Sequence, residues 1–460
     1  MRGGGILADK SQRLRDPIHG LIIFDRDNEI DMLAWRLIQT PEFQRLRRIK
    51  QLGLSEFVYP GATHTRFAHS IGVYHNARKL MGIVKKSKGE GFDERRSKVI
   101  LIAALLHDIG HGPFSHAFEV AREAIAKMRG IEAVERHEKF TAKLILAEDG
   151  DLLPILNAFD GALAKDIAKL VVADDPTDIY HAVVSSSFDA DRLDYLVRDR
   201  YMTGALTGSV DYDWLMDNLE TYDLHVPQDD DPPRLMPTFV FKAKGRQAAE
   251  DFLLARYRLY TQVYLHKTTR GFEKLISALF EHVASGVRPQ ELGLDPTHPL
   301  VRFLSQDGES LQDYRRLDDT VIWGAVECMT QCQDERANSL AKRLWHRQNL
   351  KVLDLSVAYG HDEEQRLNAG KRVAKHVSSQ LGKTVFQDEP RYNLYSRSGA
   401  EAEKAHKMVR VLEGSGGQRE ITEFDDTIIS KRLRENTTLT RYYFFSAEEC
   451  RDAGKAMRGN

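Results

Sequence analysis

The sequence predicts a mainly α-helical protein with a smaller α+β region at its C-terminal end. Apolar residues recur at helical spacing through the first part of the chain, for example at Leu33, Leu37 and Ile38. Candidate strands alternate with helical stretches mainly in residues 289–460. No internal repeat is visible, and the chain of 460 residues is long enough for one large domain or two to three ordinary ones.

The first elements follow one another in a simple order. Residues 1–13 are polar and rich in glycine, which predicts a flexible tail. A turn at residues 15–20 precedes a short strand at residues 21–24. From residue 29 to about residue 180 the pattern is mostly helical.

The middle of the chain contains one break in this helical pattern. Residues 223–237 hold three consecutive aspartates and four prolines, which predicts a surface loop. A short strand is predicted at residues 239–241 and a long helix over residues 246–287. Residues 14–288 are therefore expected to form one domain.

The C-terminal region, residues 289–460, is predicted to mix helices and strands. A glycine-rich stretch at residues 413–418 predicts a flexible loop. The candidate strands are residues 351–357, 383–386 and 442–445.

Composition narrows the class of protein. With 66 basic and 68 acidic residues the net charge is -2, so nucleic acid is not a favoured partner. Three cysteines cannot make a disulfide framework, which favours a reducing, intracellular setting. No stretch approaches the roughly 18 apolar residues that span a bilayer, and the N-terminus lacks the apolar core of a signal peptide. We expect a cytoplasmic protein without a membrane partner.

Four polar residues form the main candidate site: His69, His107, Asp108 and Asp191. An apolar run at residues 99–106 leads directly to the His-Asp pair and is followed by glycines, which predicts a helix whose polar end enters a buried pocket. Imidazole suits Mn, Fe, Zn and Ni, and carboxylate suits Mg and Mn. The mixed set therefore predicts one divalent metal ion without naming it.

Residues around these ligands support the same interpretation. Arg66 precedes His69 by three residues at a predicted helix start, so both can face one side. Asp191, Tyr195 and Arg198 or Asp199 fall on one helical stripe, an arrangement that suits a polyphosphate ester beside a cation. Asp189 is the rival of Asp191 as the carboxylate ligand.

The order His69, His107-Asp108, Asp191 resembles the HD-domain phosphohydrolase superfamily. Residues 16–20, 44–47, 59–62 and 107–116 resemble its dNTP triphosphohydrolase branch, which includes proteins with an added sterile-alpha-motif domain. The likeness runs from about residue 14 to 280 and implies a helical HD-domain core with one metal bound by the four residues. Since only about a dozen residues precede this core, no sterile-alpha-motif domain is expected.

The resemblance also implies catalytic roles. His111 is expected to be the general acid toward the leaving oxygen, and His137, followed by Glu138, to orient it. His116 is expected to line the same pocket. In other HD branches such extra histidines bind a second metal, and this two-metal alternative is open.

The resemblance further implies how a nucleotide would be held. Arginines and a lysine would bind its phosphates, Gln51 and Asp199 would contact the sugar 3′-hydroxyl, and Tyr195 and Tyr264 would pack on the sugar and base. A tyrosine against C2′ would favour deoxyribose. The phosphate-binding residues would be Arg66, Arg192, Arg256 and Lys267.

Regulation is the least specific part of the likeness. Gln44 and Arg47 match residues that read an allosteric nucleotide, but Gln39 replaces the aspartate that reads guanine. An amide cannot accept from guanine N1 and N2 as a carboxylate does, so an activator other than a guanine nucleotide, or none, is expected. The relatives' assemblies imply a homo-oligomer, either a dimer or a tetramer.

The resulting hypothesis is a metal-dependent enzyme that converts a dNTP to deoxynucleoside and triphosphate. The alternative is an HD-type phosphodiesterase or nuclease acting on nucleic acid or a cyclic nucleotide. A third class, a nucleotide sensor with vestigial hydrolysis, is disfavoured by the intact ligand set.

Overall fold

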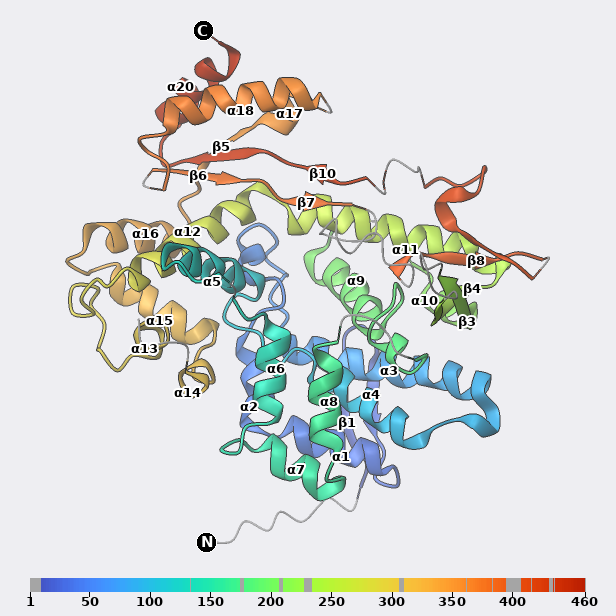
Figure 1. Cartoon of the computed structure of the whole chain (residues 1–460). Helices are drawn as coiled ribbons and strands as arrows, with labels where there is room; N and C mark the ends of the chain where they lie inside the picture. The colour runs from blue at the N-terminus through green and yellow to red at the C-terminus, as the bar shows by residue number, and fades with distance from the viewer. Residues whose placement is uncertain are drawn as a thin grey trace, which may run out of the picture.

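The computed structural model describes residues 10–132, 134–173, 178–206, 210–226, 234–305, 310–360, 362–382, 384–393, 407–414, 416–429, 433 and 435–459. The predicted N-terminal tail lies mostly outside these residues. The protein is mainly helical with several small sheets, as predicted (Figure 1).

The described chain begins with an antiparallel hairpin, β1 (Gln12–Asp16) and β2 (Gly20–Phe24). The predicted strand at residues 21–24 is confirmed, but β1 was expected to be tail and turn. The Asp16 carboxylate closes the connection by accepting hydrogen bonds from the backbone N–H groups of Ile18 and His19, at 2.8 and 2.9 Å.

The helical prediction for residues 29–180 is confirmed. The side chains of Asn28, Asp93 and Asp189 accept hydrogen bonds from the first turns of α1, α4 and α9, which is why these helices start where they do. The helices of this part are α1 (Glu29–Ile38), α2 (Pro41–Arg45), α3 (Arg66–Lys88), α4 (Glu94–Leu106), α5 (His116–Met128), α6 (His137–Ile145), α7 (Leu152–Phe159), α8 (Leu163–Val171), α9 (Ala190–Thr203) and α10 (Tyr212–Asp217).

Helix α3 is the centre of the N-terminal core and packs against α4 and α9. Apolar side chains such as Leu80 of α3, Ile102 of α4 and Leu196 of α9 are almost completely buried in one cluster. This packing brings the first turns of α3 and α9 to the last turn of α4, and these three ends carry the predicted ligands.

The predicted loop at residues 223–237 is wrong at both ends. Its flanks belong to an antiparallel hairpin of β3 (Leu219–Val226) and β4 (Arg234–Phe241), while residues 227–233 lie outside the described residues. The prolines suggested a loop, but Pro237 lies inside β4. The strand predicted at residues 239–241 is confirmed as the end of β4.

The long helix predicted over residues 246–287 is interrupted. It consists of α11 (Arg246–Leu259), a π-helical turn (η6, Tyr260–Tyr264) and α12 (Lys267–Ala284). This break matters because the turn carries Tyr264, a predicted substrate residue. Figure 1 shows α11 and α12 running between the N-terminal helices and the C-terminal strands.

The C-terminal part has the predicted α+β character. Helices α13 (Pro299–Phe303), α14 (Leu311–Tyr314), α15 (Asp319–Met329) and α16 (Glu335–Trp345) pack with α5 and α12 around a second buried cluster. The remaining elements are β5 (Lys351–Asp354), α17 (Leu355–Tyr359), α18 (Glu363–Val377), β6 (Val385–Asp388), β7 (Arg391–Tyr392), β8 (Arg410–Leu412), β9 (Gln418–Glu420), β10 (Thr437–Thr438), β11 (Arg441–Phe444) and α20 (Ala447–Arg458).

The three predicted C-terminal strands correspond to β5, β6 and β11, which form one antiparallel sheet in the order β5-β11-β6. The first is shorter than predicted, because α17 begins at Leu355. The loop predicted at residues 413–418 is the connection between β8 and β9, with residue 415 outside the described part.

A second sheet crosses the predicted domain boundary at residue 288. Its order is β3-β4-β8-β9, and Phe241 of β4 pairs in parallel with Val411 of β8. The division into residues 14–288 and 289–460 stays a prediction. No described helix has both the length and the apolar character needed to cross a bilayer.

Two glycines on α3 are expected to respond in opposite ways to alanine. A Cβ at Gly72 would lie 1.9 Å from Oδ1 of Asp194 and 2.5 Å from a guanidinium nitrogen of Arg198, whereas a Cβ at Gly82 meets nothing within 4 Å. Gly72→Ala should therefore lower the free energy of unfolding by about 3 kcal/mol. Gly82→Ala should raise it by about 0.5–1 kcal/mol.

Urea unfolding of the two variants against the wild type measures both effects. Equal stability of Gly72→Ala and the wild type would contradict the tight approach of α3 to α9.

Candidate metal centre and catalytic site

The four predicted metal ligands converge although up to 122 residues separate them in the sequence. His69 lies in the first turn of α3, His107 and Asp108 follow the end of α4, and Asp191 lies in the first turn of α9. His69 Nε2 is 3.0 Å from Asp191 Oδ1 and 3.7 Å from Asp108 Oδ2. His107 Nε2 is 3.2 Å from Asp108 Oδ1 and 3.9 Å from Asp191 Oδ1.

Both imidazoles turn Nε2 toward this cluster because Nδ1 is engaged elsewhere. His69 Nδ1 is 2.8 Å from Oδ2 of Asp194, and His107 Nδ1 donates to the carbonyl oxygen of Ala104 at 2.9 Å. Within the described residues, Nε2 of His107 is buried and has no hydrogen-bond partner. Two nitrogen and two carboxylate donors with fixed orientation are what a divalent cation requires, so the residues fit a metal.

The electrostatics of the cluster agree with this. Burial alone would lower the pKa of His69, but Asp191 and Asp194 raise it to about 10. Burial would raise the pKa of Asp108, but Arg66 and the neighbouring histidines hold it well below its usual range. Asp108 and Asp191 therefore stay charged as potential ligands, and a divalent cation bound by His69 would displace the proton that this imidazole holds.

Asp191 and its rival Asp189 have different environments. Asp189 caps α9, accepting from the backbone N–H of Arg192 at 2.8 Å, and its carboxylate also pairs with the guanidinium of Arg192. Asp191 instead faces His69. The structure thus places Asp191, and not Asp189, beside the predicted ligands His69 and His107.

A single buried carboxylate supports His69 from behind. Asp194 is completely buried and accepts from His69 Nδ1, from His19 Nε2 at 2.7 Å, and from Arg198 Nε at 2.7 Å. Arg198 continues to Asp16 at 2.8 Å. The network joins the N-terminal hairpin, α3 and α9 at the metal cluster.

The prediction that Arg198 shares one substrate-facing side of the helix with Asp191 and Tyr195 is wrong. Its guanidinium instead binds Asp194 on the same helix and Asp16 on β1. The neighbouring Asp199 does belong to the expected substrate region.

Arg66 contacts the candidate site through Asp108. Its guanidinium pairs with Oδ2 of Asp108, and its Nε donates to the hydroxyl of Ser115 at 2.8 Å. That hydroxyl donates to the carbonyl oxygen of Lys50 at 2.8 Å. Arg66 and His69 thus contact the same carboxylate from one helix, as the three-residue spacing predicted.

The predicted histidines lie next to the metal cluster. The rings of His111 and His137 stack with centroids 3.7 Å apart, and His111 Nε2 is 3.3 Å from Asp108 Oδ1. His137 Nδ1 is 2.5 Å from Oε1 of Glu119, and His116 Nδ1 is 2.9 Å from Oε2 of the same carboxylate.

Glu119 is the main residue that the sequence interpretation missed in this group. Glu138, the expected companion of His137, is 3.6 Å from its Nδ1 and is therefore the weaker contact. The signal for Glu119 was present, since it follows His116 by three residues at the start of α5, where both face one side.

The environments of the stacked histidines differ. Burial, with Arg66 and His137 nearby, lowers the pKa of His111 well below its usual range. Burial also acts to lower the pKa of His137, but the hydrogen bond to Glu119 outweighs it and raises the pKa. Burial would raise the pKa of Glu119, but His116 and His137 hold it well below its usual range.

These side chains also leave the two-metal alternative open. One ligand atom each of Asp108, His111 and His137 lie within 4.8 Å of one another, as do those of His111, His116 and Glu119.

The predicted sugar-binding residues come together beside η6. Asp199 is almost completely buried, with Tyr264 donating to its Oδ2 at 2.7 Å and His64 Nε2 lying 2.8 Å from its Oδ1. Burial, and then Asp199, raise the pKa of Tyr264 well above its usual range, so its hydroxyl stays protonated. Gln51 accepts no hydrogen bond at its buried Oε1 within the described residues, and its backbone N–H donates to the carbonyl of His64.

Further aromatic and cationic side chains lie around Tyr264. Tyr195 lies edge-on to Tyr264 with ring centroids 6.4 Å apart, and Tyr260 does so at 5.0 Å. The guanidinium of Arg256 lies 5.5 Å from the ring centroid of Tyr260. Burial would lower the pKa of Arg192, but Asp189 raises it beyond its usual range, so this residue is anchored as a cation.

Lys267 is the predicted phosphate ligand with the fewest described contacts to the rest of the site. It is the exposed first residue of α12, and no described hydrogen bond or ion pair joins it to the other site residues.

A cavity of about 650 Å³ opens on one side of the metal cluster. His107, His137, Glu138 and Asp191 lie in its wall. Its wall also contains three cationic residues and one histidine that the sequence did not single out: Arg136, Lys139, Lys407 and His181. A volume of this size accommodates a nucleotide-sized ligand.

The predicted allosteric pair lies away from this cavity on α2 and the turn that follows it. Arg47 Nε donates to Gln44 Oε1 at 2.8 Å, and its guanidinium lies 3.5 Å from the ring centroid of Phe67. Gln44 in turn donates to the carbonyl of Ile38 at 2.7 Å. The two residues are therefore neighbours, and their role in binding an allosteric nucleotide stays a prediction.

Comparison with known proteins identifies the same region. The family described as HD domain matches residues 66–194, and the HD associated region matches residues 233–294. The chain is 34% identical over 344 residues to the uncharacterized protein YwfO of Bacillus subtilis, an alignment covering 74% of this chain and 72% of that protein.

Two further relatives are more informative about chemistry. The chain is 28% identical over 354 residues to the deoxynucleoside triphosphate triphosphohydrolase SAMHD1 homolog of Dictyostelium discoideum, covering 75% of this chain and 60% of that protein. It is also similar to the crystal structure of a phosphohydrolase from Bacteroides thetaiotaomicron, with a TM-score of 0.71 at 26% identity, covering 95% of this chain and 100% of that one.

Proposed function

The chain belongs to the HD-domain phosphohydrolase superfamily, and from this premise we propose that it is a metal-dependent triphosphohydrolase that converts a dNTP to deoxynucleoside and inorganic triphosphate. The convergence of His69, His107, Asp108 and Asp191, with the buried Nε2 of His107 unpaired in the described part of the chain, carries the proposal.

The four residues would hold one divalent cation, which when bound supplies Lewis-acid polarisation of a phosphoryl oxygen and activation of a water molecule. Asp194 and the carbonyl of Ala104 keep both imidazoles turned toward that position. Arg66 offsets charge on Asp108 and presents a cation beside the position of the α-phosphate.

His137, whose pKa is raised, is proposed to hold the proton for the departing 5′-oxygen, and the neighbouring His111 is proposed to relay it. Their stacked rings lie beside Asp108, and Glu119 fixes the ring of His137. The proton passes to a sugar alkoxide, which is a poor leaving group without protonation.

The group around Asp199 is proposed to recognise the sugar. Gln51 offers a buried acceptor oxygen, which a 3′-hydroxyl could satisfy. Tyr264 is fixed by its hydrogen bond to Asp199, so its ring can exclude a 2′-hydroxyl by contact with C2′. Tyr195, Arg192, Arg256 and Lys267 would complete the nucleotide site.

The proposal is tested by product analysis. Purified protein is incubated with Mn or Mg and with each dNTP and NTP, alone and in mixtures, and the products are separated. Release of triphosphate with deoxynucleoside is the expected result. Nucleoside monophosphates or oligonucleotide fragments would instead support the phosphodiesterase or nuclease alternative, and no product under any condition would contradict both.

Mixtures of nucleotides also test regulation and assembly. We propose that Gln44 and Arg47 contact an activating nucleotide and that the active protein is a dimer or tetramer. Activation of dNTP turnover by a second nucleotide, lost in Arg47→Ala, together with a mass shift in light scattering, is the expected result.

Glu119→Gln is expected to lower kcat about 10- to 100-fold with little change in KM. The substitution keeps the shape but removes the carboxylate that accepts from both His116 and His137. Steady-state kinetics with the best dNTP substrate, alongside measured metal content, tests this. Glu123→Gln, an exposed change on the same helix, is the matched control, and equal kcat values for the two variants would contradict the role of Glu119.

A further inference from the structure

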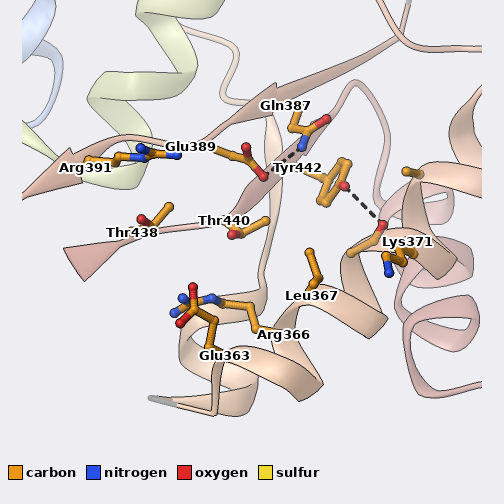
Figure 2. Close-up of a pocket in the computed structure, with 12 residues that line it drawn as sticks. Glu363, Arg366, Leu367, Lys371, Gln387, Glu389, Arg391, Thr438, Thr440 and Tyr442 are labelled. Carbon is orange, nitrogen blue, oxygen red and sulfur yellow. Dashed lines mark hydrogen bonds between the residues drawn. The ribbon is translucent and has the colours of Figure 1, made fainter. Parts of the chain in front are cut away.

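A second cavity, of about 310 Å³, lies in the C-terminal part between α18 and the strands (Figure 2). On the helix side its lining residues recur at a spacing of three or four, from Glu363 through Arg366 and Gly370 to Ala374. On the strand side they alternate along two paired segments, one running from β6 to β7 and the other from β10 to β11. The first segment contributes Gln387, Glu389 and Arg391, the second contributes Thr438, Thr440 and Tyr442, and Glu389 and Thr440 lie between the strands of their segments.

The cavity exists because small residues occupy the helix face. A helix on a sheet is normally sealed by large apolar side chains, but here Gly370 and Ala374 face the strands. A Cβ at Gly370 would meet only Leu355 and the Tyr442 hydroxyl, at 3.7 and 4.0 Å. That hydroxyl donates to the carbonyl of Gly370 at 3.2 Å and marks the floor.

The lining is polar and positively charged on balance. Three cations, Arg366, Lys371 and Arg391, face two carboxylates, Glu363 and Glu389. Within the part of the chain that the structure describes, none of these cations has a side-chain hydrogen bond or ion pair. Glu389 accepts from the Gln387 side chain at 3.0 Å.

These groups are distributed unevenly over the cavity. Figure 2 shows Arg366 and Arg391 near one end, on either side of the hydroxyls of Thr438 and Thr440, and Tyr442 toward the other end. Two guanidinium groups flanking two hydroxyls form a geometry suited to a phosphate. The carboxylates add acceptors for the hydroxyl or amino groups of the same ligand.

We propose that this cavity binds a small phosphate ester that carries hydroxyl or amino donors, with the size of a nucleoside monophosphate. Arg366 and Arg391 bind the phosphate, and Glu363 or Glu389 accepts from the remainder. A volume near 300 Å³ is at the lower end of small-molecule sites, which suits one nucleoside and one phosphate.

The opposite face of the same strands contacts the segment that carries Tyr264. Asp388, between two lining residues of β6 and the turn after it, pairs with Arg270 of α12 at 2.6 Å. Arg441, between Thr440 and Tyr442, donates to the carbonyl of Leu265 at 2.6 Å. Because neighbouring residues of a strand point to opposite faces, a ligand that orders these strands also restrains residues 260–270.

Calorimetric titration of the full chain tests the site. The probes are AMP, dAMP, ribose 5-phosphate, adenosine and inorganic phosphate. AMP or dAMP is expected to bind at least 10-fold more tightly than adenosine or inorganic phosphate. Two separate changes should each weaken that binding at least 10-fold: the double variant Arg366→Gln/Arg391→Gln, and Ala374→Leu, which fills the cavity without changing charge.

Lys375→Gln, an exposed change on α18 outside the cavity, is the matched control and should bind as the wild type does. Undiminished binding to both cavity variants, or no binding of any phosphate ester at 5 mM, overturns the proposal. The titrations do not depend on hydrolysis, so they stand apart from the proposed triphosphohydrolase activity.

Hydrogen–deuterium exchange measures the link to the catalytic part. Saturating ligand should slow exchange in residues 260–270 of the wild type and of Lys375→Gln, but not of Ala374→Leu. Binding without slower exchange there would overturn the link between the two faces of the strands.

Discussion

His107→Ala is expected to abolish dNTP hydrolysis, with activity at least 1000-fold below the wild type, and to lower metal affinity at least 100-fold. His107 supplies a buried Nε2 that has no hydrogen-bond partner in the described residues and faces Asp108 and Asp191. Removing one of four donors leaves the carboxylates without a fixed cation position. Equilibrium dialysis with Mn, followed by elemental analysis, measures the loss of metal.

The fold should survive this change. The His107 side chain is 23% exposed and lies just beyond the end of α4, so its removal leaves the apolar contacts of the helix intact. Circular dichroism and urea unfolding close to those of the wild type are expected. His346→Ala, at an exposed histidine, is the control and should keep full metal content. A metal content unchanged by His107→Ala would place the cation elsewhere and remove the basis of the proposed mechanism.

The His107-Asp108 pair could be predicted as a candidate metal site from a local signal, whereas Asp191 was preferred to Asp189 through the resemblance to the HD-domain superfamily. His107 and Asp108 follow an apolar helix directly, and the three-residue spacing of Arg66 and His69 sets both on one face of α3. Helix ends were also predictable from local residues, since caps such as Asp93 act within one turn.

The residues that the sequence did not reveal act across long separations. Asp194 is one of several aspartates on α9, and nothing local distinguishes it. Its role depends on His19, 175 residues away, and on His69, 125 residues away. Such a contact depends on how the hairpin and α3 pack, which no periodicity encodes.

The same limit applies to the fold. Pro237 and three aspartates suggested a loop, yet tertiary pairing with β3 places Pro237 inside β4. The parallel pairing of Phe241 with Val411 joins segments 170 residues apart and could not be read from either strand. Local signals therefore predict the helices, whereas the sheets require the assembled protein.

Asp194→Asn is expected to lower the free energy of unfolding by about 3–5 kcal/mol, because it breaks a buried ion pair while its partner stays buried. Arg198 is completely buried and would keep Asp16 as its charged partner. The new amide would also place N–H groups against N–H donors of Arg198 and of His19 or His69.

The same change should weaken metal binding about 10- to 100-fold, since Asp194 fixes the ring orientation of His69. Asp166→Asn is the matched control: it also removes a carboxylate from an arginine, but the pair with Arg95 is exposed and should be worth about 0–1 kcal/mol. Urea unfolding and Mn dialysis on both variants separate the two effects. If Asp194→Asn lost stability but bound metal as tightly as Asp166→Asn, Asp194 would be a structural residue only. Loss of both properties would establish that one buried carboxylate holds the hairpin, α3 and α9 together and at the same time orients a metal ligand.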